Sequence, residues 1–308
     1  HNGNLKIAKK LVSKAKEIGA DAIKFQTFKA DDLASKNSKF FKLFKKLELS
    51  YNDFAELSDH AKSSGIIFFS TPFSNKAVDL LDKLNVPAFK IASGDLTNIP
   101  LIRYISAKMK PVILSTGMAD MNEVNYAVRT INSINKKIII LHSVSAYPTP
   151  TKEVNLSTLD HLKQKFPYPI GYSDNGSDDL VPLAAIARGA KLIEKHFTLD
   201  NKLKGPDHSL SADPNQFQNL IKNIRIIEEM LGDGIKKCQP SELKNKVLAR
   251  RSITANTTIG KNSIIRREMI GIKRPATGIE PRFLSKVLGK RAKRTIQIDS
   301  AIKWSDIG

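Results

Sequence analysis

Polar side chains that are able to bind an anion stand in or directly after several short apolar runs of the sequence. Lys24 and Gln26 are two residues apart in the run 21–28 (DAIKFQTF), and Lys90 stands in the run 88–94 (AFKIASG). If these runs are strands, Lys24 and Gln26 share one face. A lysine inside an apolar strand is costly unless it meets an anion, and for one lysine a neighbouring carboxylate would be a sufficient partner. Two lysines on different strands, both followed by hydroxyl side chains, favour a bound phosphate or carboxylate.

Hydroxyl, phenol and carboxylate side chains end the other runs in the same way. They are Thr71 in the run 66–73, Ser93 and Asp95 after Lys90, Ser115 in 111–116, Ser145 and Tyr147 after 138–144, and Ser173 in 169–174. If the strands are parallel, their carboxyl ends meet at one edge of the sheet. The sequence therefore predicts a polar, anion-binding site at that edge.

A second group of residues has the donors for a divalent cation. Glu194 and His196 share parity in the run 192–198 and face the same side, while Asn175 and Asp207 follow neighbouring runs. A lone histidine on a strand is more often a core residue than a ligand. One imidazole among oxygen donors suits Mn²⁺ or Mg²⁺ better than Zn²⁺, so these residues predict a weak site for one of the first two ions.

The elements that must position these residues follow from hydrophobic periodicity. Seven apolar, β-branched runs alternate with amphipathic segments of helical period, and the segments include 5–18, 75–84, 100–109, 122–134, 180–188 and 214–231. This alternation predicts an α/β fold with a parallel sheet, and eight such units close into a (β/α)8 TIM barrel. A doubly wound open sheet would tolerate seven strands, but no G-x-G-x-x-G motif follows any of the runs.

The pattern along the chain also predicts its domains. Residues 1–232 form the barrel, the polar segment 233–247 is a linker, and residues 248–308 are a small β-rich domain broken by glycine and proline. The helical segment 5–18 has no strand before it, and the chain begins with His1 instead of Met. We therefore expect a short N-terminal segment that carries the first barrel strand.

Composition and charge limit the classes of function. Of 308 residues, 41% are hydrophobic and 26% are charged, which excludes a disordered or fibrous chain. The sequence has neither a secretory signal nor an apolar run long enough to span a membrane. Its single cysteine, Cys238, cannot form an internal disulfide and fits a reducing compartment, so we expect a cytoplasmic protein.

The net charge of +20 raises nucleic acid and anionic membranes as partners. Residues 248–308 contain 14 basic and 4 acidic residues and so carry half of that charge. Many other lysines alternate with small or apolar residues on expected helix surfaces, which favours a solvated lysine-rich exterior over a nucleic-acid footprint. We expect neither a nucleic-acid nor a membrane partner.

A series of short motifs is similar, in order and spacing, to those of the sialic acid synthase family, including its legionaminic and pseudaminic acid branches. The motifs are HNGN, IKFQTF, STPFS, FKIASGD, ILSTGM, LHSVSAYPTP, GYSD, EKHFTL, GPDH and IKRPATG, and they cover essentially the whole chain. The resemblance implies a phosphoenolpyruvate-condensing TIM barrel that needs a divalent metal, usually Mn²⁺. It also implies a C-terminal antifreeze-like (SAF) domain, which caps the partner's active site in a domain-swapped homodimer.

Residue by residue, the resemblance assigns a role to each candidate. The phosphoenolpyruvate pocket would contain Lys24, Gln26, Thr71, Lys90, Ser93, Ser115, Ser145 and Ser173. The amino-sugar would meet Asp95, Tyr147, Glu194 and Asp207, with Arg274 of IKRP reaching in from the other subunit. The expected catalytic residues are Lys24, Lys90, Tyr147 and Glu194.

The metal site departs from the family pattern. His196 matches one metal-binding histidine, but Asn175 in GYSDN stands where the family has a second histidine. Ser145 likewise stands where well-known members have asparagine. The family's general-base glutamate belongs to an E-I-G-x-N-H motif whose last residue matches His1, so this glutamate is expected in the segment before His1.

The resemblance implies condensation of phosphoenolpyruvate with an open-chain 2-acetamido hexose to a nine-carbon 2-keto-3-deoxy acid and phosphate. One alternative is another phosphoenolpyruvate-condensing barrel that makes pseudaminate or a shorter 3-deoxy acid. The other is a non-enzymatic protein that binds polyanions through its basic tail, although Phe283 and Trp304 are the only large aromatic side chains there. GPDH is closer to the sialic and legionaminic branches, but the sequence leaves the sugar open.

Overall fold

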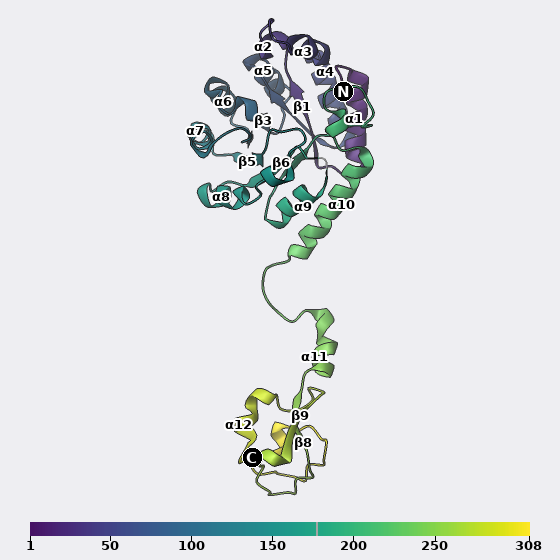
Figure 1. Cartoon of the computed structure of the whole chain (residues 1–308), viewed down its shortest axis with the longest axis vertical. Coiled ribbons are helices and arrows are strands. Elements are labelled where there is room, and N and C mark those ends of the chain that lie inside the picture. Colours follow the sequence, from purple (N-terminus) through teal and green to yellow (C-terminus); the bar gives the residue numbers. More distant parts are fainter. Residues whose placement is uncertain (177) are drawn as a thin grey trace. The chain divides into compact units, whose positions relative to one another are not determined.

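The computed structural model describes residues 1–176 and 178–308. It divides the chain into two compact units, His1–Gly232 and Asp233–Gly308 (Figure 1). Each unit has its own apolar core.

Within the described residues, the first unit is built on a parallel sheet of seven strands in sequential order. The strands are β1 (Ala22–Thr27), β2 (Ile67–Pro72), β3 (Phe89–Ile91), β4 (Val112–Ser115), β5 (Ile138–Ser143), β6 (Ile170–Asp174) and β7 (Ile193–Lys195). Each strand falls inside one of the seven predicted runs. The sheet curls, and helices cover its outer face, so the predicted barrel-type α/β fold is confirmed (Figure 1).

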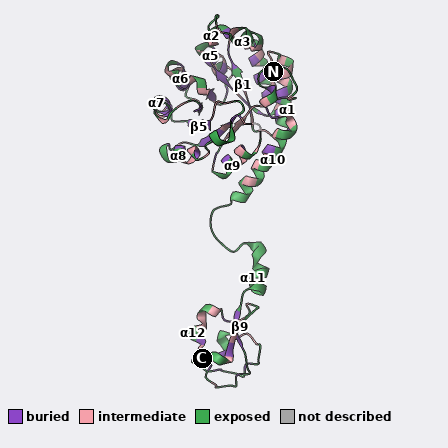
Figure 2. Cartoon of the chain, in the orientation of Figure 1, coloured by how far each residue is buried: buried purple, intermediate pink, exposed green. Residues whose placement is uncertain are grey.

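The helices of this unit precede, connect and follow the strands, and most of them bury one side against the sheet. They are α1 (Leu5–Glu17), α2 (Ala30–Leu33), α3 (Phe41–Leu47), α4 (Tyr51–Ser64), α5 (Asn75–Lys83), α6 (Ile99–Ser106), α7 (Met121–Asn132), α8 (Thr158–Lys165), α9 (Leu180–Ala187) and α10 (Pro214–Leu231). Figure 2 shows their inner sides buried and their outer sides exposed. Many lysines lie on these outer sides or in exposed loops, which is why so basic a chain still forms an apolar core.

Local sequence sets where the helices begin. The Asp213 side chain accepts from Gln216 N at the start of α10, and the Gln216 side chain accepts from Asp213 N. Ser50 and Asp53 form the same reciprocal pair at the start of α4. Such capping boxes satisfy backbone N–H groups that have no partner within the helix.

The second unit is small and β-rich, as predicted. It contains α11 (Leu243–Ala249), the antiparallel strands β8 (Ser252–Ala255) and β9 (Ile270–Lys273), and α12 (Leu284–Val287). Further single bridges extend the pairing, and the core includes Ile253 and Ile302, both fully buried. The segment 233–247, predicted as a linker, ends inside α11, which exposes Leu243, Val247 and Leu248.

None of the helices in residues 1–176 and 178–308 has the length and apolar character needed to cross a membrane.

Candidate active site

A cavity of about 280 Å³ opens at the carboxyl ends of the strands in the first unit. Twelve of the predicted site residues line it: Lys24, Gln26, Thr71, Lys90, Ser93, Ser115, Ser145, Tyr147, Ser173, Asn175, Glu194 and His196. Ala92, Gly94, Met118 and Ser143 complete the lining. The parallel sheet brings these residues together because all its strands end at one edge.

A carboxylate lies between the two lysines in this cavity. Lys24 Nζ is 3.2 Å from Glu194 Oε1, and Lys90 Nζ is 3.1 Å from Glu194 Oε2. Lys90 Nζ also donates to Ser115 Oγ at 2.7 Å. One carboxylate therefore partners both lysines. The cluster of Lys24, Lys90 and Glu194 keeps a net charge of +1.

Burial and charge together set the protonation of this cluster. Burial would raise the pKa of Glu194, but the ammonium groups of Lys90 and Lys24 lower it to about 2. Burial lowers the pKa of Lys90, Glu194 opposes that effect, and Lys24 adds to it. At neutral pH Glu194 is thus a carboxylate, and it cannot act as a general acid while both lysines contact it.

The hydroxyl groups of the cavity are placed by close backbone contacts. Gly117 N donates to Ser93 Oγ at 3.0 Å. A Cβ on Gly117 would come within 2.3 Å of Ser145 Oγ and 2.8 Å of Ser93 Oγ. Glycine is therefore needed where the β4–α7 loop passes between these serines.

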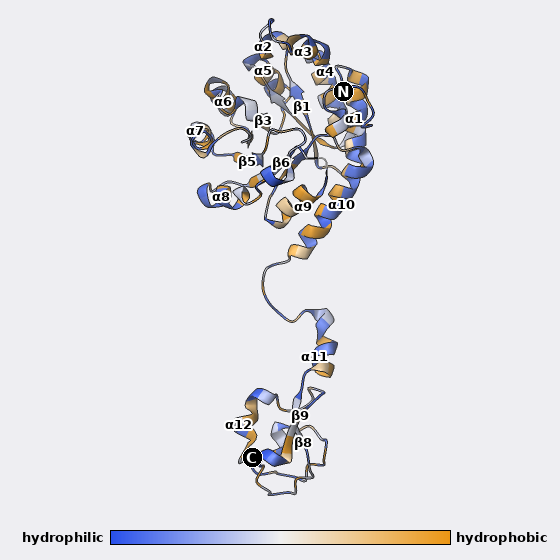
Figure 3. Cartoon of the chain, viewed as in Figure 1, coloured by the Kyte–Doolittle hydropathy of each residue, from blue (hydrophilic) through white to orange (hydrophobic). Residues whose placement is uncertain are grey.

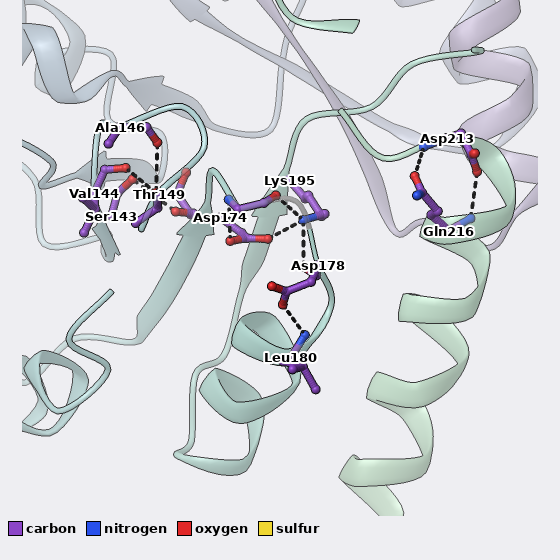
Figure 4. A network of polar contacts seen from close by, with 12 residues as sticks. Ser143, Val144, Ala146, Thr149, Asp174, Asp178, Leu180, Lys195, Asp213 and Gln216 are labelled. Atoms are coloured by element: carbon purple, nitrogen blue, oxygen red, sulfur yellow. Dashed lines mark hydrogen bonds and ion pairs between the residues drawn. The ribbon is translucent and has the colours of Figure 1, made fainter. Parts of the chain in front are cut away.

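Side-chain and backbone hydrogen bonds join the loops after β5 and β6 (Figure 4). Asn175 Nδ2 donates to Val144 O at 2.8 Å, and Ser143 Oγ donates to Ser173 O at 3.1 Å. Thr149 N donates to Asn175 O at 3.2 Å. These bonds position the part of the cavity lined by Ser145, Tyr147, Ser173 and Asn175.

Comparison with known proteins identifies the family to which this site belongs. Residues 11–236 match the NeuB family, and residues 250–308 match the SAF domain. The chain belongs to the NeuB family. The predicted resemblance to the sialic acid synthases is confirmed, and so is the expected C-terminal domain.

Individual relatives cover nearly the whole chain. An uncharacterized protein of Methanocaldococcus jannaschii is 49% identical over 100% of this chain and 91% of its own length. The N,N'-diacetyllegionaminic acid synthase of Legionella pneumophila is 41% identical over 100% of this chain and 92% of its own length. The crystal structure of N-acetylneuraminic acid (sialic acid) synthetase from Leptospira borgpetersenii, in complex with citrate, has a TM-score of 0.77 and 36% identity, over 80% of this chain and 86% of that one. The chain is thus similar to sugar-acid synthases throughout.

The NeuB family resemblance implies a divalent metal, and two cavity residues can ligate one. Burial and the charge of Lys24 lower the pKa of His196, so its ring is neutral and able to ligate at pH 7. Asn175 donates through its side-chain Nδ2, which leaves the side-chain oxygen Oδ1 as the ligating atom. In the described part of the chain, no group of three or more His, Cys, Asp or Glu side chains is placed to hold a metal. Two protein donors would leave most coordination positions of Mn²⁺ or Mg²⁺ to water and substrate oxygens.

Three predicted site residues do not line the cavity. Asp95 follows Ser93 in a short 3₁₀ turn and accepts from Asn98 Nδ2 at 3.1 Å, and burial raises the pKa of its carboxyl. Asp207 is exposed. The burial of Tyr147 raises the pKa of its phenol, and the negative charge of Asp207 raises it further. Arg274 is exposed and belongs to the second unit.

Sequence reasoning missed two residues that hold this NeuB-family site in place. Gly117 belongs to the ILSTGM motif, but its distance along the chain from Ser93 and Ser145 gives no sign that it contacts either serine. Lys195 stands between Glu194 and His196 and faces the opposite side of β7, where it forms a salt bridge with Asp174. A lysine flanked by two cavity residues was the available signal, since a buried lysine needs a partner.

Proposed function

We propose that this NeuB-family chain condenses phosphoenolpyruvate with an open-chain 2-acetamido hexose to give a nine-carbon 2-keto-3-deoxy acid and phosphate. This makes it a C–C bond-forming transferase. The similarity to a legionaminic acid synthase and a sialic acid synthetase supports the sialic or legionaminic type of product.

The single observation that carries the proposal is the cluster of Lys24, Lys90 and Glu194 in the cavity. Its net charge is +1, and it is surrounded by the hydroxyl groups of Thr71, Ser93 and Ser115, among others. A small trianion such as phosphoenolpyruvate offers a phosphate and a carboxylate, so it can pair with both lysines at once. When it does, Glu194 is released from the lysines and becomes available to the sugar.

The reaction then depends mainly on proximity. The methylene carbon of phosphoenolpyruvate attacks the aldehyde carbon, and the electron pair of the enol double bond forms the new C–C bond. The aldehyde oxygen takes up a proton, and water adds to the resulting cationic C2 and loses a proton. The C2–O bond to phosphate then breaks as the new C2 hydroxyl gives up its proton and becomes the ketone. A divalent cation held by His196 and Asn175 would supply a Lewis acid for the aldehyde oxygen.

The residues of β5 to β7 suit the sugar side of the cavity. Burial, Asp207 and Glu194 raise the pKa of Tyr147, so its phenol stays protonated and can donate a hydrogen bond. Tyr147 also packs edge-on to His196, with ring centroids 5.9 Å apart. We assign Tyr147 and Glu194 to the sugar, with Asp95 and Asp207 at the entrance.

A homodimer would complete this site. In the proposed dimer, Arg274 of one chain reaches the cavity of its partner, where a guanidinium can donate to the sugar's acetamido oxygen. Exposed apolar side chains support the association of two chains: Ile226, Met230 and Leu231 are exposed near the C-terminal end of α10. Figure 3 colours part of that helix as hydrophobic. An exposed apolar stripe of this kind is typical of an interaction surface.

Phosphate release tests the proposal. The full-length protein should release phosphate from phosphoenolpyruvate only when an acetamido hexose and a divalent cation are both present. The masses of the products from a panel of acetamido hexoses would name the sugar. Release with a shorter aldose instead would favour another condensing barrel. Absence of release, together with a salt-dependent gel shift of nucleic acid, would favour the polyanion-binding alternative.

A further inference from the structure

A buried salt bridge lies behind the cavity wall. Ser173, Glu194 and His196 line the cavity, whereas Asp174 and Lys195 occupy the alternate positions of β6 and β7 and face away from it. Their side chains are 0% and 3% exposed, and Lys195 Nζ contacts Asp174 Oδ2. Neither residue has a part in the reaction proposed above.

Lys195 contacts more than its carboxylate partner. Its Nζ donates to Gly176 O at 2.9 Å and to Asp178 O at 3.2 Å, and Gly176 N donates to Asp174 Oδ1 at 3.0 Å. One ammonium group on β7 therefore binds the loop that leads from β6 to α9 at several points (Figure 4). That loop carries Asn175 into the cavity.

Asn175 extends the contacts to the next loop. Its Nδ2 donates to Val144 O at 2.8 Å, and its backbone oxygen accepts from Thr149 N at 3.2 Å. Val144 and Thr149 flank Ser145 and Tyr147 in the loop after β5. Hydrogen bonds, together with the backbone that joins Asp174, Asn175 and Gly176, thus link Lys195 to the loop that carries Tyr147.

We propose that Lys195, paired with Asp174, is a positioning residue that holds the β5–α8 and β6–α9 loops in the geometry needed to bind the sugar. The inference rests on the proposed function for its choice of substrate. A buried ion pair by itself adds little net stability compared with apolar residues of similar size. The two loop contacts of Lys195 and the one of Asp174 give this pair a role that an apolar pair lacks, because they orient backbone groups next to the cavity.

Two variants separate positioning from simple stability. Lys195→Met leaves Asp174 buried without its ammonium partner and should lower the thermal midpoint strongly. The double variant Asp174→Leu, Lys195→Met removes both charges, so most of that stability should return. The loop contacts of Lys195 are absent from both variants.

The kinetic expectation is a split between the two substrates. In the double variant the KM for the acetamido hexose should rise about tenfold or more, since small displacements of positioning groups are costly. The KM for phosphoenolpyruvate should change less, because its two charged partners, Lys24 and Lys90, lie on β1 and β3 and only the hydroxyl groups of Ser145 and Ser173 lie near the altered pair. Lys108→Met is the matched control: Lys108 pairs with Asp79 at 2.7 Å, away from the cavity, and its loss should leave both KM values unchanged. Wild-type kinetics in the double variant would overturn the proposal.

Hydrogen exchange gives a readout that does not need the reaction. Residues 143–149 lie at the end of β5 and in the loop after it, whereas Asp174 and Lys195 lie on β6 and β7. Amides of residues 143–149 should exchange faster in the double variant than in the wild type and the Lys108→Met control. If the wild type releases no phosphate with any sugar, the proposed function fails while this result still tests the coupling. Unchanged exchange at 143–149 would show that the pair does not position the loop after β5.

Discussion

Glu194 is ion-paired with Lys90, whose Nζ lies 3.1 Å from Glu194 Oε2. The other carboxylate oxygen of Glu194, Oε1, contacts Lys24 Nζ. The two ammonium groups that were predicted to bind a substrate anion therefore already share a carboxylate of the chain. An anionic substrate has to compete with Glu194 for both lysines, and its binding frees Glu194.

Lys90→Ala should raise the KM for phosphoenolpyruvate strongly and the KM for the sugar little. Removing one partner of a buried charged pair costs on the order of 2 to 5 kcal/mol. Steady-state kinetics with each substrate varied in turn would measure the split, and Lys24→Ala should behave alike. If either variant keeps its phosphoenolpyruvate kinetics but loses thermal stability, that lysine serves only as a structural partner of Glu194.

The stability of the chain should depend on Glu194 at acid pH. The pKa of Glu194 is lowered from 4.5 to about 2, so the unfolded chain binds this proton more tightly than the folded chain does. The contribution of Glu194 is present above a pH of about 4.5 and is lost as the pH falls through about 2. Thermal midpoints between these pH values should fall less steeply in Glu194→Gln than in the wild type. Parallel curves for the two proteins would contradict the assigned ion pairs.

Metal should be required for turnover and held weakly. One imidazole and one amide oxygen bind a first-row metal less tightly than two imidazoles. We expect a chelator to abolish phosphate release and purified protein to retain little Mn²⁺ by elemental analysis. Release undiminished by the chelator would exclude the metal role, and full occupancy after purification would contradict weak binding.

Asn175→His should tighten metal binding by restoring a second imidazole. Equilibrium dialysis with Mn²⁺ measures this without the reaction. Asn175→Ala is the companion variant and should weaken binding, because only His196 remains as a protein ligand. Equal affinities in all three proteins would show that position 175 does not ligate the metal.

Arg274 should act across subunits. At a phosphoenolpyruvate concentration far below the KM of the Lys90→Ala variant, mixing Arg274→Ala and Lys90→Ala proteins should give more activity than either protein alone, since one of the two sites in a heterodimer would then contain both native residues. Subunit exchange is verified first by native mass spectrometry of differently tagged chains. A fully active monomer, or no recovery after exchange, would show that Arg274 remains outside the neighbouring site.

The parts of the fold that repeat locally were predictable from the sequence. Apolar, β-branched runs separated by amphipathic segments predicted the positions of all seven strands, because burial on both faces of a parallel sheet demands such runs. Residues at the carboxyl ends of those runs had to meet at one edge. Most of the candidate site could therefore be named before any distance was known, and the family motifs agreed with it.

Tertiary structure alone decided which of these groups pair. Nothing in the spacing of Lys24, Lys90 and Glu194 shows that one carboxylate satisfies both lysines, because the three residues come from strands far apart in the sequence. The same holds for the contacts of Lys195 with the loop after β6, which depend on the register of β7 beside β6. Sequence determined which side chains reach the cavity edge, since that follows from periodicity; only the curled sheet decided their partners, since ion pairs and hydrogen bonds depend on distances in space.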